Sequence, residues 1–125
     1  MTVKVDWSKA SDFDEFKKPV LYRAIALTGR NADGKIVGIG GIAFPNTGIP
    51  FAFSDLTEEA RKNPISLHKA ALRLLELAKS KNIKQLAASA DMAASPAAER
   101  WLKRLGFNKE TIGNIELWIW RNKNG

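Results

Sequence analysis

The chain has 125 residues, of which 45% are apolar and 26% are charged, with no cysteine and one histidine. This length suits one domain with one core, and the residue counts argue against disulfides, thiol chemistry and a zinc site, so we expect no metal. The apolar stretches are shorter than the ~20 residues that span a bilayer, and the first residues lack an apolar secretory block, so we expect a cytoplasmic protein without a membrane partner.

The net charge of +7 is unevenly distributed along the chain. Residues 1–55 carry +1 of it and residues 56–125 carry +6. A basic surface can bind a polyanion or a phosphorylated small molecule, and it can also be a solvated surface that keeps the protein soluble. If there is an anionic partner, we therefore expect it to bind the second half.

The first half of the chain predicts a run of strands interrupted by one short helix. Alternating apolar and polar residues, or short β-branched runs bounded by turn residues, are typical of strands. We expect strands over residues 3–5, 20–27, 36–44 and 51–53, and a helix between its cap, Ser11, and Lys18. Asp33 and Gly34 favour a hairpin between the second and third strands. These two strands are therefore expected to be antiparallel neighbours.

The second half predicts two helices that alternate with strands. A helix over residues 64–81 begins with Asn63 as cap and Pro64 at the first position, and a second one begins with Ser95 and Pro96 and ends at Gly106. Strands are expected over residues 83–90 and 115–119, the latter reached from Phe107 through a turn at Gly113. We expect Trp101 in the core, and Trp118 and Trp120 against a helix or a partner.

The element order is therefore β-α-β-β-β-α-β-α-β-β, which predicts an α+β (mixed α/β) fold. A twisted mixed sheet with helices on both faces accommodates this order. No repeat or Pro/Ser-rich linker divides the sequence. We expect a single domain over residues 1–121 and a frayed tail over residues 122–125.

Two short segments contain residues that are typical of nucleotide or phosphate sites, and only the second has a suitable structural context. Gly38, Gly40 and Gly41 lie inside a predicted strand, so they do not form a dinucleotide fingerprint and instead permit a bulge or a close backbone approach. Arg61-Lys62-Asn63-Pro64-Ile65-Ser66 places two cations and a hydroxyl at the start of the longest helix, where free N–H groups attract anions. The alternative is ordinary capping by Asn63, with both cations in solvent.

Side chains for catalysis are sparse. His68 has no partner that the sequence brings near it, and it also fits a packed surface residue. Asp55 and Asp91 each follow a predicted strand, at positions where open sheets gather ligands, although aspartate is also a common turn former. No Ser/His/Asp constellation follows from these positions.

Residues 95–107 resemble the closing signature of the GNAT superfamily of acyl-CoA N-acyltransferases, N-x-x-A-x-x-x-Y-x-x-x-G-F. The ending Leu105-Gly106-Phe107 fits best, and the order of elements is similar over most of the chain. The resemblance implies a GNAT-like sheet with acyl-CoA in a cleft between the strands over residues 51–53 and 83–90. It also implies pyrophosphate at the start of the long helix, with acetyl-CoA as cosubstrate. The cofactor-binding residues it implies are Phe53, Ser54, Arg61, Lys62, Asn63 and Ser66.

The chain departs from the GNAT pattern at four positions. In the phosphate loop, Pro64 replaces the first glycine and Ser66 replaces the small last residue. Leu102 stands where the family presents a tyrosine that protonates the thiolate, and Ser95 replaces an asparagine. Amine acylation needs a base and a proton donor. As substitutes we name Asp55 as the base and Ser89 or Ser95 as the donor.

Three functions follow as hypotheses. The first is an acyl-CoA-dependent N-acyltransferase that acts on an unidentified amine. The second, motivated by Pro64 and Leu102, is a catalytically inactive GNAT-like protein that binds a protein partner or belongs to a phage virion. The layout of Phe53-Ser54-Asp55, followed by Arg61 and the run from Trp101 to Phe107, resembles that of short GNAT-like bacteriophage proteins. The third is a nucleic-acid binder. It rests only on the charge of the second half, which lacks the interleaved aromatic residues of such proteins. The sequence leaves the acceptor and the oligomeric state open.

Overall fold

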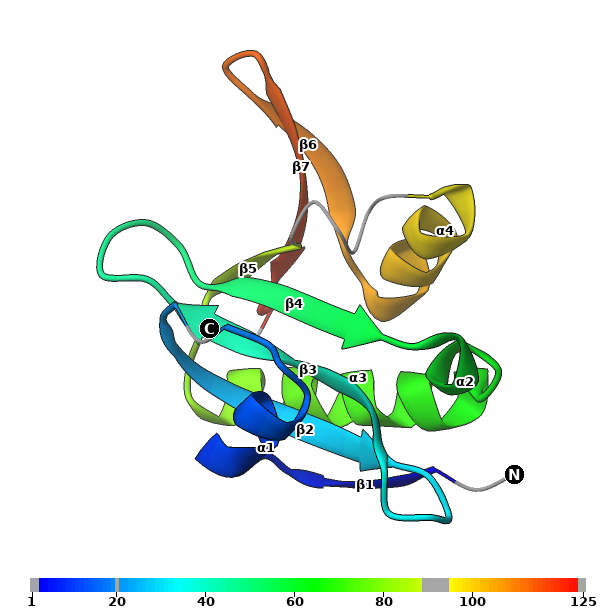
Figure 1. Ribbon diagram of the computed structural model, residues 1–125. Helices are drawn as coiled ribbons and strands as arrows, with labels where there is room; N and C mark the ends of the chain where they lie inside the picture. The colour runs from blue at the N-terminus through cyan, green and yellow to red at the C-terminus, as the bar shows by residue number, and fades with distance from the viewer. Residues whose placement is uncertain (1–2, 20, 89–94, 124–125) are drawn as a thin grey trace.

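The computed structural model describes residues 3–19, 21–88 and 95–123. Its centre is a seven-stranded sheet in the order β1-β2-β3-β4-β5-β7-β6 (Figure 1). The strands are β1 (Lys4–Trp7), β2 (Arg23–Arg30), β3 (Ile36–Phe44), β4 (Phe51–Leu56), β5 (Gln85–Ala88), β6 (Asn108–Ile112) and β7 (Ile115–Arg121). The fold is therefore α+β, as the sequence predicts.

Strands β4 and β5 are parallel, while all other neighbouring strands of the sheet are antiparallel. The parallel pairing covers Phe51↔Ala87 and Ala52↔Ala88. A parallel connection needs a crossover, and the helix α3 provides it. The β6–β7 hairpin projects away from the body of the molecule (Figure 1).

In the described part of the chain, helices cover both faces of the sheet, as predicted (Figure 1). They are α1 (Ala10–Glu15), α2 (Glu58–Arg61), α3 (Pro64–Ser80) and α4 (Pro96–Leu105). Phe13 and Phe16 of α1 pack on a cluster formed by Ala26, Ile36 and Ile39. On the opposite face, α3 and α4 share the larger cluster, made of Ile42, Leu75, Ala78, Leu86, Ala88, Leu102, Leu105, Phe107, Trp118 and Trp120.

The predicted starts of α3 and α4 and the predicted end of α4 are confirmed, although the Asn63 side chain makes no capping hydrogen bond to α3. Asn63 and Ser95 are the N-cap residues, each is followed by proline, and Gly106 ends α4 with a φ of 102°. The left-handed conformation at Gly106 explains why glycine occupies this position. Trp118 and Trp120 are buried in the same cluster as α4, so they cover a helix, whereas Trp101 is only half-buried.

Several predicted boundaries are wrong. The first helix begins at Ala10 with Lys9 rather than Ser11 at its N-cap, because Asp12 turns inward and its carboxylate accepts a hydrogen bond from the Lys9 N–H. β2 begins at Arg23 and continues to Arg30, and β5 begins at Gln85 rather than at residue 83. The strand that was expected to stop before Ser54 and Asp55 continues to Leu56.

The helix α2, which lies between β4 and α3, is not predicted from the sequence. The Thr57 hydroxyl donates to the Val37 carbonyl oxygen at 2.8 Å and accepts from the Ala60 N–H at 3.3 Å. Thr57 thus fixes the end of β4 against β3 and caps α2 at the same time. The segment expected to be a phosphate loop is therefore partly helical.

No helix within the described ranges combines the length and the apolar content that a membrane span requires. The predicted domain limits, residues 1–121 with a tail over residues 122–125, stay a prediction.

Candidate active site

The first component of the candidate site is the edge of β4 that faces β5. One edge of β4 pairs with β3 along its whole length, and the other pairs with β5 only at its start. The Pro50 carbonyl oxygen accepts from the Ala87 N–H at 3.1 Å and so points toward β5. Because backbone groups alternate along a strand, those of Ser54 and Leu56 point to the same side. Within the described residues, no backbone group pairs with them there.

The amino terminus of α3 is the second component. The Leu67 N–H makes the first backbone hydrogen bond of this helix, to the Asn63 carbonyl oxygen at 3.2 Å. The N–H groups of Ile65 and Ser66 precede it, and Pro64 has none, so two N–H groups at this end are available to an anion. The Asn63 side chain donates to the Glu59 carbonyl oxygen at 3.0 Å and does not cap α3.

The charges of α2 partly offset one another. Arg61 is the last residue of α2 and Lys62 follows it, and both are exposed. Glu58 and Glu59 lie in the first turn of the same helix. The positive field near α3 therefore comes from the placement of the two cations and the helix terminus, not from an excess of basic residues.

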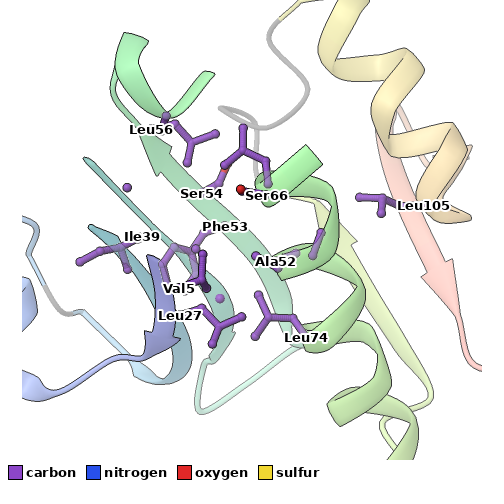
Figure 2. A pocket seen from close by; sticks show the side chains of 18 of the residues that line it. Val5, Leu27, Ile39, Ala52, Phe53, Ser54, Leu56, Ser66, Leu74 and Leu105 are labelled. Atoms are coloured by element: carbon purple, nitrogen blue, oxygen red, sulfur yellow. The ribbon is translucent and has the colours of Figure 1, made fainter. Parts of the chain in front are cut away.

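The predicted site residues of β4 lie on two different faces of the strand. Ser54 lines a cavity under α3 together with Asn63 and Ser66, as Figure 2 shows for the two serines. Phe53 packs on the opposite face, against the cluster beside α1. Asp55 shares that second face, because side chains alternate along a strand.

Asp55 has a cation as its neighbour. Its carboxylate Oδ2 lies 3.2 Å from Lys18 Nζ, and its side chain is 56% exposed. Lys18 Nζ also lies 5.2 Å from the centre of the Phe53 ring. An exposed pair of this kind is weak, so the carboxylate stays accessible to an amine.

The two predicted proton donors have different outcomes. Ser95 Oγ accepts a hydrogen bond from the Ala98 N–H at 3.1 Å, as the cap of α4. A hydroxyl that accepts in this way can still donate its proton. Ser89, like Asp91, lies outside the described residues. Leu102 is fully buried in the core and has no group that titrates.

A side-chain hydrogen bond that the sequence does not predict joins α3 and α4. Trp101 Nε1 of α4 donates to His68 Nδ1 of α3 at 3.2 Å. Because Nδ1 accepts, the neutral imidazole carries its proton on Nε2. The lone histidine therefore links α3 to α4. The sequence could not indicate this pair, since the two residues are separated by 33 positions.

A buried carboxylate holds α1 on the sheet. Asp12, which is 6% exposed, accepts from the Lys9 N–H at 3.0 Å, from Thr28 Oγ1 at 2.9 Å and from Arg30 Nη2 at 2.9 Å. Burial acts to raise the pKa of Asp12, but these hydrogen bonds and the charge of Arg30 outweigh it, so the pKa lies below its ordinary value of 3.8. The hydrogen bond to Glu15 in turn raises the pKa of Arg30.

Comparison with solved structures identifies the fold. The ribosomal-protein-S18-alanine N-acetyltransferase of Escherichia coli has a TM-score of 0.71 and 11% identity, over 97% of this chain and 94% of that one. The ribosomal-protein-S5-alanine acetyltransferase of Vibrio fischeri has a TM-score of 0.69 and 14% identity, over 98% and 94%. The PaiA N-acetyltransferase of Thermoplasma acidophilum, in complex with coenzyme A, has a TM-score of 0.69 and 12% identity, over 97% and 99%.

These similarities are structural. No protein-family model matches the chain, and no curated protein matches it by sequence. The structural neighbours nevertheless cover nearly the whole chain. The chain therefore has the fold of the GNAT N-acetyltransferases.

Proposed function

We propose that the chain is an acyl-CoA-dependent N-acyltransferase that transfers an acyl group to an amine. The observation that carries this proposal is the edge of β4 at Ser54 and Leu56, which lies beside the amino terminus of α3. A strand edge can pair with the amides of an extended pantetheine arm, and a helix start can bind its pyrophosphate. The neighbour from Thermoplasma acidophilum, solved with coenzyme A, supports this choice of ligand.

Each predicted cofactor-binding residue has a separate role in this proposal. The Ser54 backbone pairs with pantetheine, while Phe53 supports β4 from the opposite face. The N–H and hydroxyl of Ser66 and the N–H of Ile65 bind pyrophosphate. Arg61 and Lys62 attract the pyrophosphate through their positive charges. Asn63 holds α2 against the start of α3.

The chemistry of the transfer needs two proton movements. The amine nitrogen attacks the thioester carbon, a C–N bond forms and the C–S bond breaks. Asp55 accepts the proton that the amine loses, and Ser89 or Ser95 donates a proton to the thiolate that leaves. Acetyl-CoA is the simplest donor for this reaction, and its products are an amide and free CoA.

Isothermal titration with CoA and with acetyl-CoA tests the donor site. We expect Arg61→Ala and Lys62→Ala each to weaken binding by about threefold, as for an exposed charge contact, and more at low salt than at high salt. Lys81→Ala is the matched control, because it removes the same charge at the opposite end of α3. Absence of heat at millimolar ligand would refute the proposal.

A second candidate is a GNAT-like protein that has lost acyl transfer. The burial of Leu102 favours it, because no hydroxyl is available at that position for the thiolate. This protein would bind a protein partner, as a phage virion component does in the hypothesis above. Turnover of acetyl-CoA with a panel of amines, abolished by Asp55→Asn, would exclude this candidate, whereas CoA binding without turnover would support it.

A further inference from the structure

A cavity of about 90 Å³ lies between the sheet and α3 (Figure 2). Side chains of β1 to β4 form its floor, α3 forms its roof, and Trp101 and Leu105 of α4 contribute at one end. Ser54, Asn63 and Ser66 place polar side chains on its wall, and the rest of the lining is almost entirely apolar. The cavity therefore suits a hydrocarbon better than a polar ligand.

Glycines of β2 and β3 lie on the floor of this cavity. Gly29 of β2 faces Gly38 of β3, and Leu27 faces Gly40, so these residues share one face of the sheet. A Cβ at Gly29 would lie 3.1 Å from Val3 Cγ1, and one at Gly40 would lie 3.3 Å from the Phe53 carbonyl oxygen. A Cβ at Gly38 would lie 2.8 Å from Leu56 Cδ2 and 3.6 Å from Ala60 Cβ. None of the nearest atoms at these three glycines belongs to α3.

The cavity also reaches the place where the donor is proposed to bind. Its walls include Ala52 and Ser54 of β4 and Leu86 of β5. The pairing of β4 with β5 extends to Ala52 in the described residues. A thioester carbonyl bound at the edge of β4 would therefore lie beside residues that line this cavity.

We propose that this cavity receives the hydrocarbon end of the acyl group, so that the donor is a short-chain acyl-CoA longer than acetyl-CoA. This inference rests on the proposed function. An apolar protein cavity of about 150 Å³ holds the six carbons of benzene. By proportion, 90 Å³ holds about three or four carbons. Butyryl-CoA, with three carbons beyond its carbonyl, fits this space.

Titration of the whole chain with CoA, acetyl-CoA and butyryl-CoA tests the inference. Each methylene buried strengthens binding by about fourfold, so the two extra methylenes of butyryl-CoA are expected to lower Kd by about fifteenfold relative to acetyl-CoA. Ala70→Leu, which fills the cavity from α3, is expected to abolish this preference and to leave the Kd for CoA unchanged. Ala10→Leu, on the exposed start of α1, is the matched control.

The outcomes separate this inference from the proposed function. Absence of CoA binding would refute the proposed function and the inference with it. Binding of CoA without a preference for butyryl-CoA would overturn the inference alone, and so would a preference that survives in a folded Ala70→Leu. If that variant does not fold, the Kd values of the three ligands for the wild-type chain still show whether butyryl-CoA is preferred, and so still test the inference.

Discussion

Replacement of Asp12 by alanine should loosen α1 from the sheet. The carboxylate is buried and accepts three hydrogen bonds, one of which comes from the N-cap of α1. Two of the donors have other partners: Thr28 Oγ1 lies 2.6 Å from Ser8 Oγ, and Arg30 also contacts Glu15 and the Gly34 carbonyl oxygen. The Lys9 N–H is the donor that loses its acceptor.

The magnitude follows from these contacts. Loss of a helix cap costs about 1 kcal/mol, and loss of a buried charge-assisted hydrogen bond costs about 1.5–3 kcal/mol. Since Thr28 and Arg30 can turn to their other partners, we expect Asp12→Ala to lower the free energy of unfolding by about 3 kcal/mol. For a chain of this size that corresponds to a fall in Tm of about 10 °C.

The stabilisation should also depend on pH. The pKa of Asp12 is lower in the folded chain than its ordinary value of 3.8, so the unfolded chain binds more protons between the two values, and stability rises with pH there. The contribution is fully present above the unfolded pKa and is lost as the pH falls through the folded one. The difference between wild type and Asp12→Ala should therefore shrink in strong acid.

Urea unfolding at pH 7 and below pH 3 measures this effect. Asp14→Ala is the control, because Asp14 is an exposed aspartate on the same helix. Equal unfolding free energies for Asp12→Ala and Asp14→Ala at pH 7 would refute the reasoning, since they would show that the buried contacts do not stabilise the fold.

Two further predictions concern the core and the contact between α3 and α4. Trp101→Phe should cost about 1 kcal/mol, because it removes the hydrogen bond to His68 and keeps the ring. The double variant with His68→Ala should then cost less than the sum of the two single changes, and strict additivity in denaturant unfolding would contradict a direct bond. Phe107→Ala should cost about 3–5 kcal/mol, because the ring is 2% exposed. A Tm unchanged by that substitution would show that Phe107 is not part of the core.

The candidate site was predictable in part. Arg61, Lys62 and Ser66 are close in sequence to the start of α3, so the anion-binding character of that end could be inferred directly. Ser54 and Asp55 were also named, but the strand that carries both continues past them, and alternation places them on opposite faces. Lys18, the neighbour of Asp55, was not predictable, because 37 positions separate the two residues.

Local signals in the sequence by themselves determined the main elements and their order. Ser95-Pro96 and Gly106 delimit α4, Asp33-Gly34 marks the β2–β3 hairpin, and helical spacing marks α3. Each of these signals acts within a few residues, so it survives without tertiary contacts. The helix α2 was missed because its four residues are too few to show a period, and its cap, Thr57, is fixed by β3.

Only the tertiary structure decided which distant residues meet. The ion pair of Arg30 with buried Asp12, the His68–Trp101 bond and the burial of Trp118 and Trp120 against α4 all join segments far apart in the chain. The cavity beneath α3 is lined by residues of the sheet, α3 and α4, which are far apart in the chain. Packing and register are properties of the assembled sheet, so no local pattern in the sequence specifies them.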